Sequence, residues 1–232
     1  LDADLYENWT DVSGFLSADP RIVQNPRAIG RITFDEMREL SYMGASVLQE
    51  EAIFPVREAN IPIQIKNTNR PEDTGTVIRE TADGDTNEHL ITGIAGKKDF
   101  LAIHVKKAHM SNEVGVISRA LNIVERYGVS VEHIPTGVDS FGIVVNASDV
   151  KDTVYSIISD IRREIEPDDI TMVDRLALVS VVGRNMSRRS GTSGKIFGAL
   201  GNAGVNIRMI TQSSEEISII VGVDHADFDC TI

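Results

Sequence analysis

The stretch HMSNEVGVISRALNIVERYGVSVEHI (residues 109–134) recurs in altered form as NMSRRSGTSGKIFGALGNAGVNIRMI (residues 185–210). The two stretches align without a gap, and the match continues into the apolar segment that follows each of them. The aligned identities are Met110 with Met186, Ser111 with Ser187, Gly115 with Gly191, Gly128 with Gly204, Ile134 with Ile210, Ile143 with Ile219 and Val145 with Val221. Two unrelated copies of a generic strand-helix-strand pattern account poorly for so many matches at one offset. We therefore infer an internal duplication.

Each copy predicts the order strand, helix, strand, strand, helix. In the first copy we expect strands at 100–108, 129–134, 139–146 and 170–175 and helices at 112–128 and 150–164, with Asp149 as a candidate N-cap and Gly128 as a C-cap. This order is typical of a βαββαβ, ferredoxin-like unit. The second copy ends inside or before its second helix, so we expect the chain to be part of a longer protein.

Residues 1–80 predict a different α/β unit. Thr33 and Glu36 form a candidate capping box at the start of a helix that is interrupted at Gly44. A second helix is expected at 49–59, and IPIQIKN (61–67) alternates as a half-buried strand does. The predicted fold class is thus α/β (α+β). The predicted domains are 1–80, a joining linker or strand at 81–97, a first repeat unit at 98–175 and a second, truncated unit at 176–232.

The composition of the chain argues against several classes of binding partner. The formal net charge is −12 and the pI about 4.8, which disfavours nucleic acid and anionic membrane surfaces because both attract clustered cations. No apolar run approaches the length of a membrane span. The one cysteine, Cys230, suits a reducing cytoplasm, and the five histidines show no zinc-ligand spacing. We expect a cytoplasmic protein without a bound metal of its own.

The loop NWTDVSGFLSADPR (Asn8 to Arg21) follows the first predicted strand and contains two acidic turns, a Gly and an Arg. One reading is an ordinary loop, because Thr, Asp, Ser, Gly and Pro are what loops are made of. The other is the ligand-binding rim of an α/β sheet, which lies beyond the carboxyl ends of its strands. The loop alone does not decide between them.

Further motifs decide in favour of the second reading. Tandem βαββαβ units with a glycine at the first helix N-terminus and G-[VI]-[NS]-[IV] after the helix resemble ACT domains, which sense amino acids. Preceded by WTDVSGFLSADPRIVQNPR, MGASVL and IPIQIKNT, the pair resembles the C-terminal half of the aspartate kinases over essentially the whole chain. The resemblance implies the end of a three-layer amino-acid-kinase domain followed by two ACT domains.

The resemblance also implies an activity: ATP-dependent phosphorylation of the L-aspartate side-chain carboxylate, with Mg²⁺, as the first step of lysine, threonine and methionine biosynthesis. The family's phosphate-binding loop and aspartate-binding arginine belong upstream of Leu1. We therefore expect the full-length protein to be the enzyme and this chain alone to be inactive.

Carried over by position, Thr10 and Asp11 would contact the nucleoside end of ATP, and Arg21 would reach the phosphates. Leu16 stands where many members have Tyr, Ser46-Val47 where many have Lys-Val, and Gln49 where His is common; Ser46 thus removes a phosphate-facing cation. The predicted ATP-binding set is Thr10, Asp11, Leu16, Arg21, Ser46 and Val47. The alternative is that this segment is a structural strand-to-helix turn.

An amino-acid effector needs N–H groups for its carboxylate and an acid for its ammonium. We expect a helix N-terminus near Ser111-Asn112 to supply the first, and Glu132 the second. Arg208, the matching residue of the second copy, would repel an ammonium. The predicted effector set is Met110, Ser111, Asn112, Val114, Gly115, Glu132 and Val138, with lysine and/or threonine as ligand and a homodimer formed through the ACT domains. The alternative for Glu132 is a solvated carboxylate.

Three functions compete: an allosteric aspartate kinase, a non-catalytic regulatory subunit that holds only the ACT pair, and a free-standing amino-acid-binding ACT protein. The second and third have no need of the nucleotide-site segment at residues 8–47. That segment therefore favours the first.

Overall fold

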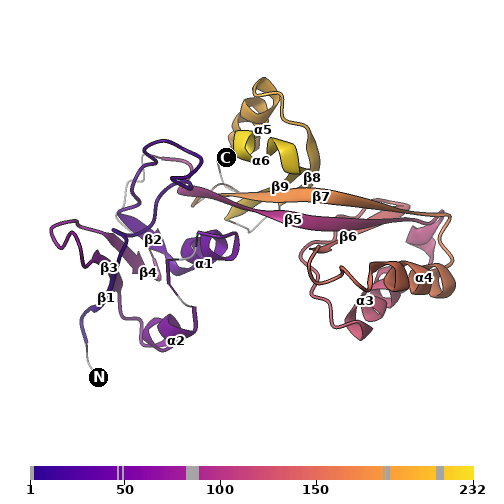
Figure 1. Cartoon of the computed structure of the whole chain (residues 1–232), viewed down its shortest axis with the longest axis horizontal. Helices are drawn as coiled ribbons and strands as arrows, with labels where there is room; N and C mark the ends of the chain where they lie inside the picture. Colours follow the sequence, from indigo (N-terminus) through magenta and orange to yellow (C-terminus); the bar gives the residue numbers. More distant parts are fainter. Residues whose placement is uncertain are drawn as a thin grey trace.

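The computed structural model describes residues 3–45, 47–48, 50–81, 89–184, 186, 189–212 and 217–232. Figure 1 shows a smaller N-terminal part joined to an elongated part that is built around two long strands. The N-terminal elements are β1 (Tyr6–Thr10), β2 (Arg31–Thr33), α1 (Phe34–Tyr42), α2 (Glu50–Glu58), β3 (Ile63–Asn67) and β4 (Thr76–Arg79). The remaining ones are β5 (Gly93–Lys106), η1 (Met110–Asn112), α3 (Val116–Arg126), β6 (Ser140–Asn146), α4 (Val154–Ile165), β7 (Asp169–Val182), α5 (Thr192–Asn202), β8 (Ile207–Thr211), β9 (Ser218–Asp224), η3 (His225–Asp227) and α6 (Phe228–Thr231).

The N-terminal part holds a four-stranded sheet in the order β1-β3-β4-β2. Strand β1 pairs in parallel with β3, and β2 pairs in parallel with β4. The alternation predicted for IPIQIKN is confirmed from Ile63 onward, because Ile63 and Ile65 are buried while Gln64 and Lys66 are half-buried. The predicted capping box is confirmed as well, since the Thr33 hydroxyl accepts from the Glu36 N–H and the Glu36 carboxylate accepts from the Thr33 N–H.

The second sheet is antiparallel and five-stranded, in the order β6-β5-β7-β9-β8. Strands β5 and β7 have 14 residues each. The second half of β5 lies between β6 and the first half of β7, whereas Gly93 to Lys97 pair with Val182 to Leu178 in the second half of β7. Residues 93–97 therefore supply a fourth strand to the second repeat unit, next to β7, β9 and β8. Each long strand serves both units and runs across the domain boundaries expected at 98 and 176.

The duplication reappears in the structure. Helices α3 and α5 begin and end at matching positions of the repeat, and the glycines that precede them, Gly115 and Gly191, have φ of 83° and 82°. Helices α3 and α4 lie on one side of the long strands and α5 and α6 on the other in Figure 1. The two copies are therefore the same structural unit, used at the two ends of one sheet.

Three local predictions were wrong. Helix α3 starts at Val116, not near Ser111, because Met110–Asn112 form a separate 3₁₀ turn and Gly115 is the N-cap. Residues 129–134 form no named strand and pair with β6 through a bridge between His133 and Val144. Helix α4 starts at Val154 after Thr153, so Asp149 is not its N-cap.

Helix α1 lies between the two sheets. One hydrophobic cluster contains its residues Met37 and Leu40, Ile63 of the first sheet, and Leu178 and Ile220 of the second. At 25 cal/mol per Å² of apolar surface, a core that crosses the boundary in this way holds the two parts together far more firmly than surface contacts do. Separate clusters lie under α3 and α4 and under α5.

Glu36 of α1 is fully buried within this junction. Its Oε1 accepts from the Thr92 hydroxyl at 2.6 Å, and its Oε2 accepts from Arg184 Nε at 2.8 Å. Arg184 follows β7 and its side chain is 14% exposed. A buried charge is tolerated only where it is paired and hydrogen-bonded, and Glu36 meets both conditions.

We predict that Glu36→Gln lowers the free energy of unfolding by about 3 kcal/mol or more, because it removes the negative charge from the buried ion pair between Glu36 and Arg184. Asp35→Asn is the matched control on the preceding residue: Asp35 pairs with Arg57 at 2.9 Å, but its side chain is 67% exposed. The control should change stability by less than about 1 kcal/mol. Chemical denaturation of both variants tests this, and equal losses would contradict it.

Candidate functional site

The first candidate site lies where β1 and β3 end side by side. These strands are parallel neighbours, and Thr68, just after β3, donates its N–H to the Thr10 carbonyl at 2.8 Å. The Thr10 hydroxyl donates to Asp11 Oδ1 at 3.2 Å. The structure thus brings Thr10 and Asp11 together at the carboxyl edge of the sheet, where α/β proteins bind small ligands.

The loop that follows is held against the sheet by three hydrogen bonds. The Ser13 hydroxyl donates to Asp73 Oδ2 at 2.5 Å and accepts from Asn67 Nδ2 at 2.8 Å. The Phe15 N–H donates to Thr76 Oγ1 at 2.8 Å, and the Phe15 ring is buried. Between them Gly14 takes a φ of +103°. The loop is therefore a fixed element, and Leu16, half-buried and bridged to Ala28, belongs to it.

Arg21 lies further along this loop with a side chain that is 86% exposed. Its Nε and Nη2 donate to the Asp19 carboxylate, the closest pair at 2.6 Å. The Arg21 hydrogen bond holds the pKa of Asp19 below its usual range, so the pair is ionised at neutral pH. An anion that approaches Arg21 meets a guanidinium whose fork already binds a carboxylate.

Val47 is partly buried and packs against the hydrophobic cluster that contains Phe15 and residues of α1. Ser46 and Gln49, for which a nucleotide-site role and a departure from the family pattern were noted, lie outside the described residues.

The second candidate site is a cavity of about 360 Å³ at the start of α3. Its lining residues are Met110, Ser111, Glu113, Gly115, Val116, Ile117, Ser118, Gly137 and Val138. The structure therefore brings together Met110, Ser111, Gly115 and Val138 of the predicted effector set. Asn112 and Val114 are exposed on the same loop, Val114 to 94%.

The lining of this cavity includes a charged side chain, that of Glu113, and residues with backbone N–H donors at the start of α3. The Gly115 carbonyl accepts the N–H of Arg119, which closes the first helical turn. The N–H groups of Val116, Ile117 and Ser118 precede that bond, and the first turn of a helix leaves such groups free for an anion. Glu113 pairs with Lys107 and Arg119, and the hydrogen bond from Lys107 holds the pKa of Glu113 below its usual range.

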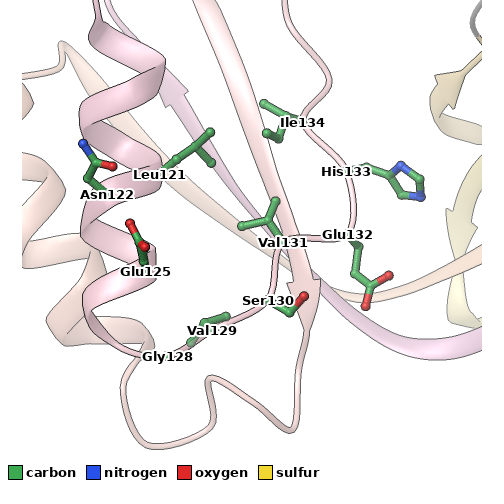
Figure 2. Close-up of a pocket in the computed structure, with 10 residues that line it drawn as sticks. All are labelled: Leu121, Asn122, Glu125, Gly128, Val129, Ser130, Val131, Glu132, His133 and Ile134. Carbon is green, nitrogen blue, oxygen red and sulfur yellow. The ribbon is translucent and has the colours of Figure 1, made fainter.

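Glu132 lies elsewhere. It lines a different, open cavity of about 700 Å³ whose walls are Leu121, Asn122 and Glu125 of α3 and the segment from Gly128 to Ile134. Figure 2 shows the Glu132 side chain pointing away from α3. One chain therefore does not bring Glu132 into the cavity of Gly115, although both were predicted to hold one ligand.

The Glu132 carboxylate has a partner that sequence reasoning missed. The Tyr42 hydroxyl, at the end of α1, donates to Glu132 Oε2 at 2.5 Å. This hydrogen bond, together with burial, raises the pKa of Tyr42 to about 12. No local pattern signals a contact between residues this far apart in the chain. Arg208, the counterpart of Glu132, instead pairs with Asp224 at 3.1 Å within the second unit.

Within the ranges that the structure describes, no three His, Cys, Asp or Glu side chains gather closely enough to hold a metal ion. None of the helices in the described part of the chain is both long and apolar enough to cross a membrane.

Comparison with known families agrees with this geometry. Residues 1–67 match the amino acid kinase family, and residues 179–232 match the ACT domain. Fold and site thus define a segment of an amino-acid kinase joined to ACT-type regulatory units, the first of which is assigned by its repeat of the second.

Individual relatives narrow this class. Aspartokinase 3 of Bacillus subtilis is 41% identical over 228 residues, which are 98% of this chain and 50% of that protein. The crystal structure of Clostridium acetobutylicum aspartate kinase superposes with a TM-score of 0.95 at 52% identity, covering 100% of this chain and 53% of that one. A chain from a crystal structure of aspartokinase alpha and beta subunits is 30% identical with a TM-score of 0.54, covering 61% of this chain and 93% of that one.

The chain belongs to the aspartokinase family. It spans 50% of the length of the Bacillus subtilis relative.

We predict that Gly14→Ala destabilises the loop from Thr10 to Arg21. A Cβ there would lie 2.2 Å from Thr76 Oγ1 and 2.8 Å from Thr76 N, at a φ that L side chains rarely adopt. The free energy of unfolding should fall by about 1–3 kcal/mol. Gly30→Ala is the control, because a Cβ at Gly30 meets nothing within 4 Å; it should change stability by less than about 0.5 kcal/mol. Urea denaturation that found the two variants alike would contradict this account.

Proposed function

We propose that this chain is the C-terminal part of an aspartate kinase, which transfers the γ-phosphoryl group of ATP to the side-chain carboxylate of L-aspartate and is inhibited by an end-product amino acid. The observation that carries the proposal is the match of nearly the whole chain to aspartokinases, with kinase-family residues and ACT residues in one polypeptide. The loop from Thr10 to Arg21 is the part of this chain that would contact ATP.

Phosphoryl transfer depends mainly on positioning and on neutralising charge. Thr10 and Asp11, fixed at the end of β1, would orient the nucleoside of ATP. Arg21 would face the phosphates, in competition with its bond to Asp19. Mg²⁺ commonly binds substrate phosphates together with one or two carboxylates, so it would enter the site bound to ATP.

A non-catalytic regulatory subunit is the alternative. It is supported by the near-complete coverage of one chain from the aspartokinase alpha and beta subunit structure, which corresponds to 61% of this chain. The kinase-family match at residues 1–67 weighs against it, because a purely regulatory chain has no use for a nucleotide loop.

A coupled assay separates the two. We predict that the full-length protein consumes ATP in the presence of L-aspartate and that the isolated 232-residue chain does not. Arg21→Ala in the full-length protein should reduce kcat/KM for ATP about ten-fold or more, since it removes a charge-assisted contact to phosphate. Arg163→Ala is the control, on an exposed face of α4. A full-length protein without aspartate-dependent turnover would leave the regulatory subunit as the function.

For the effector we propose a free amino acid, with its carboxylate at the N–H groups of Val116 to Ser118. Lysine is preferred over threonine, because a net charge of −12 favours a cationic ligand at long range. Since Glu132 and Gly115 line different cavities, we propose that the ligand lies between two copies of the chain, with the loop of one copy and Glu132 of the other. Exposed Val114 and Val138 beside the loop support a homodimer through this unit.

The assignment of Glu132 can be tested against its repeat counterpart. Glu132→Ala should raise the lysine concentration for half-maximal inhibition about ten-fold or more, as expected for a lost charge-assisted hydrogen bond. Arg208→Ala should have a much smaller effect. Titrating both variants of the full-length protein with lysine and with threonine gives the answer. Inhibition abolished by Arg208→Ala and kept by Glu132→Ala would put the effector in the second unit.

A further inference from the structure

Helix α1 contacts both repeat units through side chains along its length. Glu36 accepts from Arg184 at 2.8 Å, and Glu39 Oε2 accepts from the Ser218 hydroxyl at 2.9 Å; both donors belong to the second unit. At its end Tyr42 donates to Glu132 of the first unit at 2.5 Å. The helix therefore bridges the two units, and its C-terminal contact falls on the proposed effector residue.

Tyr42 is held from two sides. Its hydroxyl meets the Glu132 carboxylate, and Lys97 Nζ of β5 lies 4.9 Å from the centre of its ring. The hydrogen bond to the carboxylate favours the neutral phenol, and the cation over the aromatic face favours the docked position of the ring. The chain turns directly after it at Gly44 and continues into the segment with Val47, which packs against the core around α1.

We propose that Tyr42 and the effector's ammonium compete for Glu132, so that effector binding releases the C-terminal end of α1 from the first ACT unit. The inference rests on the proposed effector role of Glu132. Without the effector, the Tyr42 hydroxyl donates to the Glu132 carboxylate. An ammonium displaces it because two charged partners form the stronger hydrogen bond. The released end of α1 leads into residues 43–45 of the kinase part, which connects the effector site to that part.

The proposed competition determines whether removal of the Tyr42 hydroxyl raises or lowers the affinity for the effector. A receptor whose binding group is partly occupied by an internal competitor shows an apparent affinity reduced by the occupied fraction. Removing the phenolic hydroxyl removes the competitor, so Tyr42→Phe should bind lysine about three- to ten-fold more tightly than the wild type. A phenol that instead oriented Glu132 for the ligand would predict the opposite change.

Binding to the full-length protein is measured by isothermal titration with lysine, and separately with threonine, for the wild type, Tyr42→Phe and Tyr155→Phe. Tyr155 is the control, since it is 75% exposed on α4. Its variant should change the dissociation constant by less than about two-fold. Thermal unfolding of each variant verifies that all are folded at the titration temperature.

Tighter binding by Tyr42→Phe with an unchanged Tyr155→Phe supports the competition. Weaker or unchanged binding by Tyr42→Phe, in a protein whose wild type binds the ligand and loses it on Glu132→Ala, overturns the competition alone and leaves the effector site standing. A wild type that binds neither amino acid overturns the effector site and the competition with it.

Discussion

The rest of the structure depends on the buried carboxylate of Glu36. It accepts from the Thr33 N–H at 2.9 Å, from the Thr92 hydroxyl at 2.6 Å and from Arg184 Nε at 2.8 Å. One side chain thereby fixes the start of α1, the approach to β5 and the loop after β7. Because the loss of a partner from a buried charge costs several kcal/mol of folding free energy, these three segments are constrained to move together. The kinase part and the ACT sheet meet at this buried network of hydrogen bonds, which is surrounded by hydrophobic core.

Local sequence signals predicted much of this fold. The capping box at Thr33 and Glu36, the alternation in 61–67 and the repeat of Gly115 as Gly191 each arise from interactions within a few residues, and each was confirmed. The start of α3 was missed because the pattern before Val116 is equally compatible with a continuous helix. The pairing of Gly93–Lys97 with the distant half of β7 carries no local signal at all.

The candidate sites show the same difference between contacts within one loop and contacts between distant segments. Residues that share a loop were grouped correctly by sequence: Thr10 lies with Asp11, and Met110, Ser111 and Gly115 line one cavity. Glu132 was grouped with them as the acid that the ammonium of an effector needs, yet it lines another cavity, and Tyr42 binds it. A spacing in the chain indicates which residues share a turn. It does not indicate which element from another part of the molecule reaches the same side chain.

The shared long strands also bear on how the molecule assembles. The first half of β5 leaves the ribosome before the first ACT unit, yet its partner in β7 follows that unit. Until then this segment is an unpaired strand edge, open to wrong partners. Once the first unit folds, residues 98 and 175 are brought close, and the remaining halves of β5 and β7 can pair with little further loss of chain entropy. The first unit is in effect an insertion whose folding closes the second, so errors in the first unit's core would appear as misassembly of its neighbour.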